Sequence, residues 1–146
     1  IDREKSIASM HVCRGNWSKD ESILLEGPYT PLLDLFADIN ADLLALEFST
    51  PRAGEIKSLL ADERIKNKLI LGLGVLNPRF DEKENVDVIY NRAKEALTYI
   101  DKENLWLNPD CGFATFSNRP VNEYENIRDK VGAMVEARDR LRADYA

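Results

Sequence analysis

The sequence lacks any hydrophobic run long enough to cross a membrane, and its first residues lack the apolar core and cleavage pattern of a secretory signal. We therefore expect neither membrane insertion nor export, and we predict a cytoplasmic protein. Basic residues are also in deficit, because 20 Lys and Arg stand against 26 Asp and Glu, which gives a net charge of −6. No basic stripe with interleaved aromatic residues is present, which argues against binding to DNA or RNA.

Histidine and cysteine are scarce, since the chain of 146 residues has 1 His and 2 Cys. In a reducing compartment, two cysteines far apart in the sequence are more often free thiols or metal ligands than a disulfide. With 44% hydrophobic and 32% charged residues, the chain has the composition of one globular domain. Because it begins with Ile rather than Met, we expect residues 1–146 to be the C-terminal part of a longer chain.

A strand followed by a helix is predicted four times along the chain. The predicted strands are residues 6–13, 41–49, 68–76 and 105–113, and the predicted helices are residues 28–39, 53–62, 86–100 and a long one from about residue 123. Such units give parallel strands joined by right-handed crossovers, hence an α/β fold. A closed TIM (β/α)8 barrel needs about 250 residues. Four units therefore correspond to half of such a barrel, although a small open doubly wound sheet has the same pattern.

Helical spacing also predicts which side chains face the core. The first helix is expected to bury Leu32, Leu35, Phe36 and Ile39, and the last helix Ile127, Val131, Met134, Val135 and Leu141. Two glycines in the third strand, within LGLGV, lack the third glycine and the helix start of a dinucleotide-binding motif. Close packing between strands is the better interpretation of Gly72 and Gly74.

The candidate chemical groups fall at the carboxyl ends of the predicted strands. His11 and Cys13 are two residues apart, so on a strand they point to the same side. Glu47 ends an apolar strand, where a carboxylate is costly to bury unless a cation meets it. Cys111 follows the last predicted strand in LNPDCGF. Active sites of α/β barrels and open sheets lie at this edge of the sheet.

These four side chains offer one imidazole, two thiolates and one carboxylate, which is a plausible tetrahedral donor set for Zn²⁺. Thiolate sulfur disfavours Mg²⁺ and Ca²⁺. The plainer alternative is that the histidine and cysteine of the first strand only fill the core, since free cysteine behaves as a small buried hydrophobe. Asn16 and Asp110, next to the candidate ligands, either orient them or cap loops.

Three segments, HVCRGN, LEFST and LNPDCGFAT, resemble the zinc-binding segments of the cobalamin-independent methionine synthases, especially the shorter single-barrel bacterial and archaeal relatives. The resemblance covers essentially the whole chain and implies the second half of a TIM (β/α)8 barrel. It implies that the zinc ligands are His11, Cys13, Glu47 and Cys111. It also implies methyl transfer from methyltetrahydrofolate, or from a methylated corrinoid protein, to a thiol such as homocysteine, which forms methionine.

The chain departs from the longer enzymes of that family in one loop. Those enzymes often carry a histidine after the third of these strands, where this chain has Asn77 and Arg79, which are poor proton donors at neutral pH. The resemblance also implies that the amino acid and the folate are held largely by the first half of the barrel, so that this piece alone is inactive. The alternative function is a non-catalytic half-barrel, with a structural zinc or no metal, that assembles with a partner or as a dimer through its unpaired edge strands.

Overall fold

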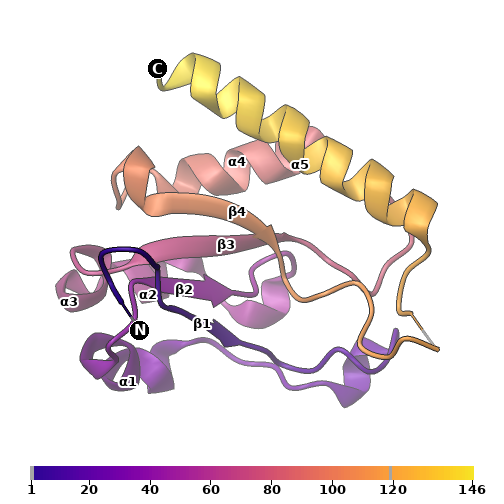
Figure 1. Cartoon of the computed structure of the whole chain (residues 1–146), viewed down its shortest axis with the longest axis horizontal. Coiled ribbons are helices and arrows are strands. Elements are labelled where there is room, and N and C mark those ends of the chain that lie inside the picture. Colours follow the sequence, from indigo (N-terminus) through magenta and orange to yellow (C-terminus); the bar gives the residue numbers. More distant parts are fainter. Residues whose placement is uncertain (1, 119) are drawn as a thin grey trace.

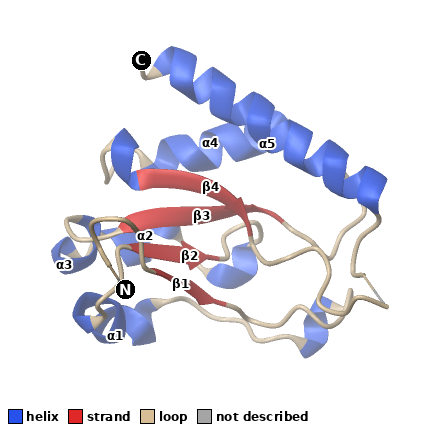
Figure 2. Ribbon diagram, in the orientation of Figure 1, coloured by secondary structure: helices blue, strands red, loops and turns tan. Residues whose placement is uncertain are grey.

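The computed structural model describes residues 2–118 and 120–146. In this part of the chain, parallel strands form one four-stranded sheet with helices packed against it (Figures 1 and 2). The strands are β1 (Ser9–Val12), β2 (Leu43–Leu46), β3 (Ile70–Leu76) and β4 (Leu105–Pro109). The α-helices are α1 (Leu33–Asp38), α2 (Ile56–Leu60), α3 (Glu63–Lys66), α4 (Val86–Ala96) and α5 (Tyr124–Asp144). Short 3₁₀ turns occupy Glu21–Ile23, Thr30–Leu32, Pro51–Ala53 and Lys102–Asn104.

The strand order is β1-β2-β3-β4, and each strand pairs in parallel with the next one along the chain. In a doubly wound sheet the order reverses at a switch point, whereas a barrel adds every strand on the same side of the previous one. The observed order is therefore that of a barrel and excludes the open doubly wound sheet. No helix in the described residues has both the length and the apolar character needed to span a membrane.

The strands are shorter than the apolar pattern predicts. The strand predicted for residues 6–13 narrows to Ser9–Val12, and the one predicted for residues 105–113 ends at Pro109, whose missing N–H cannot extend the ladder. Apolar residues continue beyond the hydrogen-bonded part of each strand because the loops that follow also pack against the rest of the protein. Consequently Cys13, Glu47 and Cys111 lie in loops just beyond β1, β2 and β4, not inside the strands.

The helix predictions were correct in place but not in length. The helix predicted for residues 86–100 ends at Ala96, and the one predicted for residues 53–62 is confined to Ile56–Leu60. A further short helix at Glu63–Lys66 was not predicted. Asp62 caps its N-terminus, because the Asp62 side chain accepts a hydrogen bond from the Arg64 N–H, so a local cap rather than apolar spacing specifies this helix.

The core lies between the sheet and its helices, and α2 and α4 run behind the strands in Figure 1. Leu44, Leu46 and Leu73 of the sheet belong to the same buried cluster as Ile56 of α2 and Ile89 of α4. The expected burial of Leu35 was wrong, because that side chain is 51% exposed. Helix α1 has only six residues, so it can bury little more than Phe36 against the sheet.

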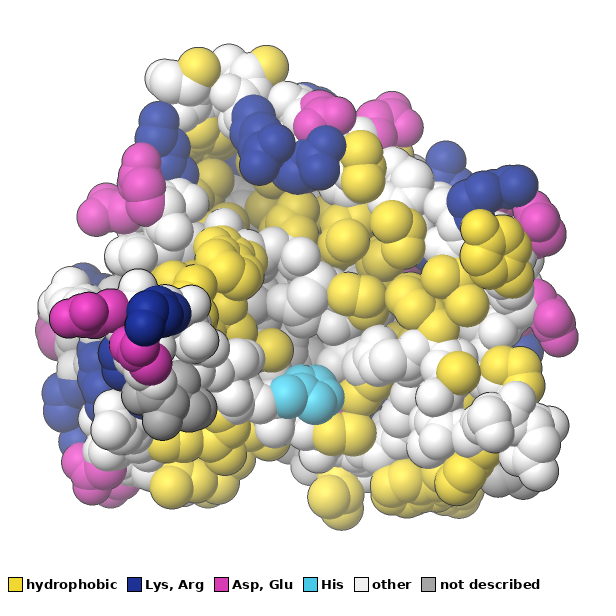
Figure 3. Space-filling model, viewed as in Figure 1, with side chains coloured by type: hydrophobic (Ala, Val, Ile, Leu, Met, Phe, Trp, Pro, Cys, Tyr) yellow, Lys and Arg dark blue, Asp and Glu magenta, His cyan; other side chains and the backbone are white. Residues whose placement is uncertain are grey.

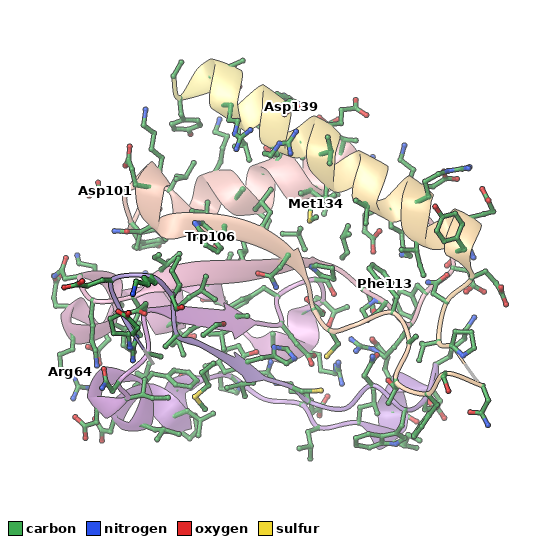
Figure 4. All side chains as sticks on the ribbon, in the orientation of Figure 1. Arg64, Asp101, Trp106, Phe113, Met134 and Asp139 are labelled. Carbon is green, nitrogen blue, oxygen red and sulfur yellow. The ribbon has the colours of Figure 1, made fainter. Side chains whose placement is uncertain are left out.

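The prediction for the buried side of α5 was right for Leu141, which is buried, but it missed other residues. Ala133, Ala137 and Lys130 are fully buried there, whereas Met134 and Val135 line an open groove of about 650 Å³ between α5 and β4. Met134 and Trp106 lie on the two sides of this space in Figure 4. The apolar stripe of α5 is therefore shared between the core and a groove at the edge of the sheet.

The two glycines of β3 confirm the close-packing interpretation. A Cβ atom at Gly72 would lie 2.6 Å from Oδ1 of Asn108, and one at Gly74 would lie 2.3 Å from Oδ1 of Asp110 and 2.5 Å from the Leu46 carbonyl oxygen. Both gaps are too small for any side chain. The missing side chains of β3 thus leave room for polar groups of β4 and its following loop to approach β2.

Candidate metal centre

Four side chains from three strand ends meet at the carboxyl edge of the sheet. One ligand atom from each of His11, Cys13, Glu47 and Cys111 lies within 4.8 Å of the ligand atoms of the other three. The two sulfur atoms are 3.3 Å apart, although 98 residues separate them in the sequence. In Figure 3 the histidine lies at the edge of a hollow on the face turned to the viewer. The structure therefore brings together all the ligand candidates that the sequence suggested.

A backbone contact orients the imidazole of His11. Its Nδ1 lies 2.8 Å from the carbonyl oxygen of Ala45 on the neighbouring strand. Because a carbonyl oxygen only accepts hydrogen bonds, Nδ1 carries the proton and donates, which leaves the lone pair on Nε2. That Nε2 is 3.5 Å from Sγ of Cys111, so the free lone pair faces the sulfur atoms.

The carboxylate of Glu47 is buried, with 2% of the residue exposed, and its two oxygens have different neighbours. Oε1 accepts a hydrogen bond from the Arg14 N–H at 2.8 Å and lies 3.2 Å from Sγ of Cys111. Oε2 is 3.3 Å from a guanidinium nitrogen of Arg52. One oxygen thus faces the thiols and the other faces the cationic side.

The Cys111 thiol lies in an environment that disfavours its charged form. Burial raises the pKa of the Cys111 thiol far above its usual range, and its hydrogen bond with Cys13 and the nearby Glu47 charge act in the same direction. Cys13 is more exposed, and its Sγ accepts a hydrogen bond from the Gly15 N–H at 3.2 Å. A divalent cation between the two sulfurs would reverse this preference, since metal coordination deprotonates a thiol.

Asp110 connects the loop after β4 to the end of β2. Its Oδ1 accepts hydrogen bonds from the Phe48 and Ser49 N–H groups at 3.1 and 3.0 Å, and its Oδ2 accepts one from the Ser49 hydroxyl. Burial, with a contribution from the Glu47 charge, raises the pKa of Asp110 to about 6. Asp110 therefore holds the backbone next to Glu47 against the backbone next to Cys111.

Asn16 acts on the same loop from the side of β1. Its amide nitrogen donates to the Gly112 carbonyl oxygen at 2.6 Å and to the Thr115 hydroxyl at 3.0 Å. Neither Asn16 nor Asp110 has a hydrogen bond to a candidate ligand side chain among the described residues. Both make hydrogen bonds that hold the loop carrying Cys111.

Sequence reasoning missed the buried groups that surround Glu47. The Tyr29 hydroxyl accepts a hydrogen bond from the Glu47 N–H at 2.8 Å, and the Arg14 guanidinium lies over the Tyr29 ring at 3.9 Å. Arg79, which the sequence singled out only as a poor proton donor, has 0% exposed surface. The position of Glu47 at the end of an apolar strand was the signal that could have predicted these cations, because a buried carboxylate requires a cation nearby.

The arrangement of donor atoms fits a tetrahedral zinc ion. Ligand atoms at about 2.0–2.3 Å from zinc are roughly 3.3–3.8 Å from one another in a tetrahedron. Three of the six separations are close to this range, at 3.3 Å between the sulfurs, 3.5 Å from the Cys111 sulfur to Nε2 and 3.2 Å from the same sulfur to Oε1, and all six are within 4.8 Å. Two sulfurs, a nitrogen and an oxygen also match the ligand types that zinc prefers over magnesium or calcium.

The fold and site define a half-barrel with a group of side chains able to hold a metal ion at the carboxyl ends of its strands. The profile of a family described as "Cobalamin-independent synthase, Catalytic domain" matches residues 7–140. The chain belongs to this family, which confirms the resemblance seen in its three segments.

Relatives and solved structures agree with this assignment. The chain is 36% identical over 108 residues to the uncharacterized protein YxjG of Bacillus subtilis (strain 168), covering 73% of this chain and 28% of YxjG. It is 30% identical over 132 residues to a methionine synthase of Pyrococcus abyssi (strain GE5 / Orsay), covering 90% of this chain and 34% of that enzyme. The chain thus spans about a third of the length of these relatives.

A solved structure confirms the fold. A B12-independent methionine synthase from Shewanella sp. W3-18-1, determined in complex with selenomethionine, matches with a TM-score of 0.75 and 19% identity. The match covers 96% of this chain and 40% of that structure. The α/β half-barrel predicted from the sequence is therefore correct.

Proposed function

We propose that this protein supplies the zinc-binding half of a methyltransferase that moves a methyl group to a thiol such as homocysteine and so forms methionine. The proposed methyl donor is methyltetrahydrofolate or a methylated corrinoid protein. Membership of the cobalamin-independent synthase family supports the reaction class, and the Pyrococcus abyssi relative is named a methionine synthase. A reducing cytoplasm is the proposed location, because the two thiols must stay free to bind metal.

We further propose that residues 1–146 form the C-terminal part of such a barrel and are inactive without the rest. The support is the coverage, since the chain matches 34% of the Pyrococcus abyssi enzyme and 40% of the Shewanella structure. A closed barrel of about 250 residues surrounds its substrates with loops from all eight strands. Four strands provide only half of those loops.

In this proposal zinc is held by His11, Cys13, Glu47 and Cys111. Bound zinc would lower the pKa of an incoming thiol and hold it as a thiolate nucleophile. The chain's own residues prepare the site: the Ala45 carbonyl selects the imidazole tautomer that leaves Nε2 free to bind. Two thiolates and one carboxylate around a divalent ion give a net charge near −1, which favours electron donation to a bound substrate sulfur.

The observation that carries the proposal is the convergence of four donor atoms within 4.8 Å. The test is the zinc content of the chain purified without chelators, compared with Cys111→Ser. We expect about one zinc per chain and a loss of affinity above about 100-fold in the variant, because removing a ligand should cost more than removing a group that orients one. Elemental analysis and competition with a chromophoric chelator measure both quantities.

Ser117→Ala is the matched control, because Ser117 is exposed in the same loop as Cys111. This variant should bind zinc as the unmodified chain does. A native preparation with reduced thiols and no bound metal would contradict the proposal. Methyl transfer to homocysteine is then measured with a full-length barrel that carries these residues, where Cys111→Ser should abolish product formation.

A second candidate function, assembly without catalysis, is favoured by the groove between β4 and α5. This groove has a volume of about 650 Å³, and Trp106 beside it is 46% exposed. Strands β1 and β4 are the two edges of the sheet, and in two copies they could pair to complete an eight-stranded barrel. The occupant in this candidate is a second copy of the chain.

Assembly predicts a dimer at micromolar concentration in analytical ultracentrifugation. Trp106→Arg should convert this dimer to a monomer, because a guanidinium in an apolar interface is left unpaired. Val88→Arg is the control, since Val88 is exposed on α4 and does not line the groove. A chain that is monomeric in its unmodified form excludes this candidate and leaves the zinc proposal unaffected.

A further inference from the structure

The largest fully buried side chain outside the candidate ligands is a cation. Arg79 lies in the loop after β3 and has 0% exposed surface. Burying a guanidinium costs on the order of several kcal/mol unless a negative charge pairs with it and its N–H groups make hydrogen bonds. An arginine at this depth therefore needs a compensating set of partners.

The three nitrogen atoms of Arg79 have different partners. Nε donates to Oε1 of Glu21 at 2.8 Å, and one terminal nitrogen donates to the Gly15 carbonyl oxygen at 3.3 Å. The other terminal nitrogen lies 3.9 Å from Oε2 of Glu47 and 3.7 Å from Oδ2 of Asp110. It has no hydrogen-bond partner among the described residues. Its N–H groups are thus next to both buried carboxylates without being committed to either.

The position of this nitrogen relative to Glu47 is informative. Oε1 of Glu47 lies 3.2 Å from the sulfur of Cys111, whereas Oε2 is the oxygen that the Arg79 nitrogen faces. A cation on the Oε2 side favours the orientation in which Oε1 is presented to the sulfurs. The same cation offsets the repulsion between Glu47 and Asp110, which are 2% and 1% exposed.

Arg52 also faces Oε2 of Glu47, at 3.3 Å, but in the described part of the chain its ion pairs are with Glu47 and Glu21 rather than with Asp110. Arg79 is the guanidinium that touches groups from the loops after β1, β2 and β4 while itself following β3. A lysine ammonium is a point charge with a single nitrogen, and it cannot make these separate contacts at once. Because these contacts come from three different loops, they exist only when the loops are assembled around the site.

We propose that Arg79 is a positioning residue of the metal centre: it orients the Glu47 carboxylate toward the thiols and balances the negative charge of the site. The inference rests on the proposed zinc site and adds a residue that is not a ligand. In the described residues the terminal nitrogen of Arg79 that faces the site lies next to Glu47 and Asp110, so its effect on the metal passes through these two carboxylates.

The test uses Arg79→Met and Arg79→Lys in the full chain, with Zn²⁺ and the spectroscopic probe Co²⁺. Removing a group that orients a metal ligand costs about 10–100-fold in metal affinity, and we expect a loss in this range for Arg79→Met. Arg79→Lys keeps the positive charge and should lose less metal affinity than Arg79→Met. In the Co²⁺ form, the sulfur-to-metal absorption should persist while the d–d bands shift, because the carboxylate rather than the thiolates is disturbed.

Lys130→Met is the matched control. Lys130 of α5 is a second cation whose side chain is 0% exposed. Its Nζ lies 2.9 Å from Oε1 of Glu84. Its loss should lower stability in a thermal unfolding measurement of the metal-free chain but leave metal affinity and the Co²⁺ spectrum unchanged. An equal effect of Lys130→Met and Arg79→Met on metal affinity would show that general destabilisation is responsible and would overturn the inference.

A double-mutant cycle with Glu47→Gln tests the route of the effect. If Arg79 acts through Glu47, Arg79→Met should weaken metal binding much less in the Glu47→Gln background than in the unmodified one. Additive losses would overturn the inference, and so would normal affinity and normal spectra in both Arg79 variants. If the unmodified chain itself binds neither ion, the proposed zinc site fails and this inference fails with it.

Discussion

Replacing Gly74 by alanine is expected to destabilise the protein by about 3 kcal/mol, at the upper end of the usual cost of overpacking. The added Cβ would lie 2.3 Å from Oδ1 of Asp110 and 2.5 Å from the Leu46 carbonyl oxygen. The carbonyl belongs to the paired strand β2 and cannot move without breaking the sheet. The Asp110 side chain must then move, which breaks its hydrogen bonds to Phe48 and Ser49.

The loss should also reach the metal centre, because Asp110 holds the loop of Cys111 against the strand end that carries Glu47. We expect a fall in zinc affinity of at least about 10-fold, as for other groups that orient ligands. Chemical denaturation and chelator competition measure the two effects. Gly132→Ala is the control: nothing lies within 4 Å of a Cβ at this position in α5. That variant should gain up to about 1 kcal/mol from helix propensity, and a similar gain in Gly74→Ala would contradict the close packing.

Removing metal is expected to make the two thiols an oxidisable pair. Their sulfur atoms are 3.3 Å apart, and a disulfide requires about 2.05 Å, so a small movement of the side chains suffices. Treating the chelator-stripped chain with diamide, an azo oxidant, should join Cys13 to Cys111. Each sulfur loses one hydrogen, and the azo group takes up both hydrogens to become a hydrazine.

Bound zinc should protect the pair, because both sulfurs then donate their lone pairs to the ion. Mass spectrometry of the intact chain detects the loss of two hydrogens, and zinc titration of the oxidised chain should show no binding. Reduction by dithiothreitol should restore both the original mass and zinc binding. Cys13→Ser, which leaves Cys111 alone, is the control and should form no intramolecular disulfide. Equal oxidation of the metal-bound and the metal-free chain would argue against coordination by the sulfurs.

Each of these experiments tests a different interaction within the site. The glycine variant tests whether the loop after β4 is placed by packing over β3, and the thiol oxidation tests whether both sulfurs serve one ion. The Arg79 variants test whether a buried cation sets the orientation of the carboxylate. Their outcomes are separable because each experiment has its own control variant.

The sequence by itself determined the alternation of strands and helices along the chain. Periodic apolar runs are local, so they indicated the order of elements, and the two-residue spacing of His11 and Cys13 predicted that their side chains point in the same direction. The sequence was less informative on where elements end. Caps and proline decide those positions, as at Asp62 and Pro109.

Only the tertiary structure decided that the candidate ligands meet. Cys13 and Cys111 are 98 residues apart, and their contact depends on the strand order and on the register of β3 with β4. It also placed Arg79 between two buried carboxylates and Asp110 in the gap over Gly74. No local pattern encodes such contacts, because they arise from long-range packing of segments whose own sequences are compatible with many surroundings.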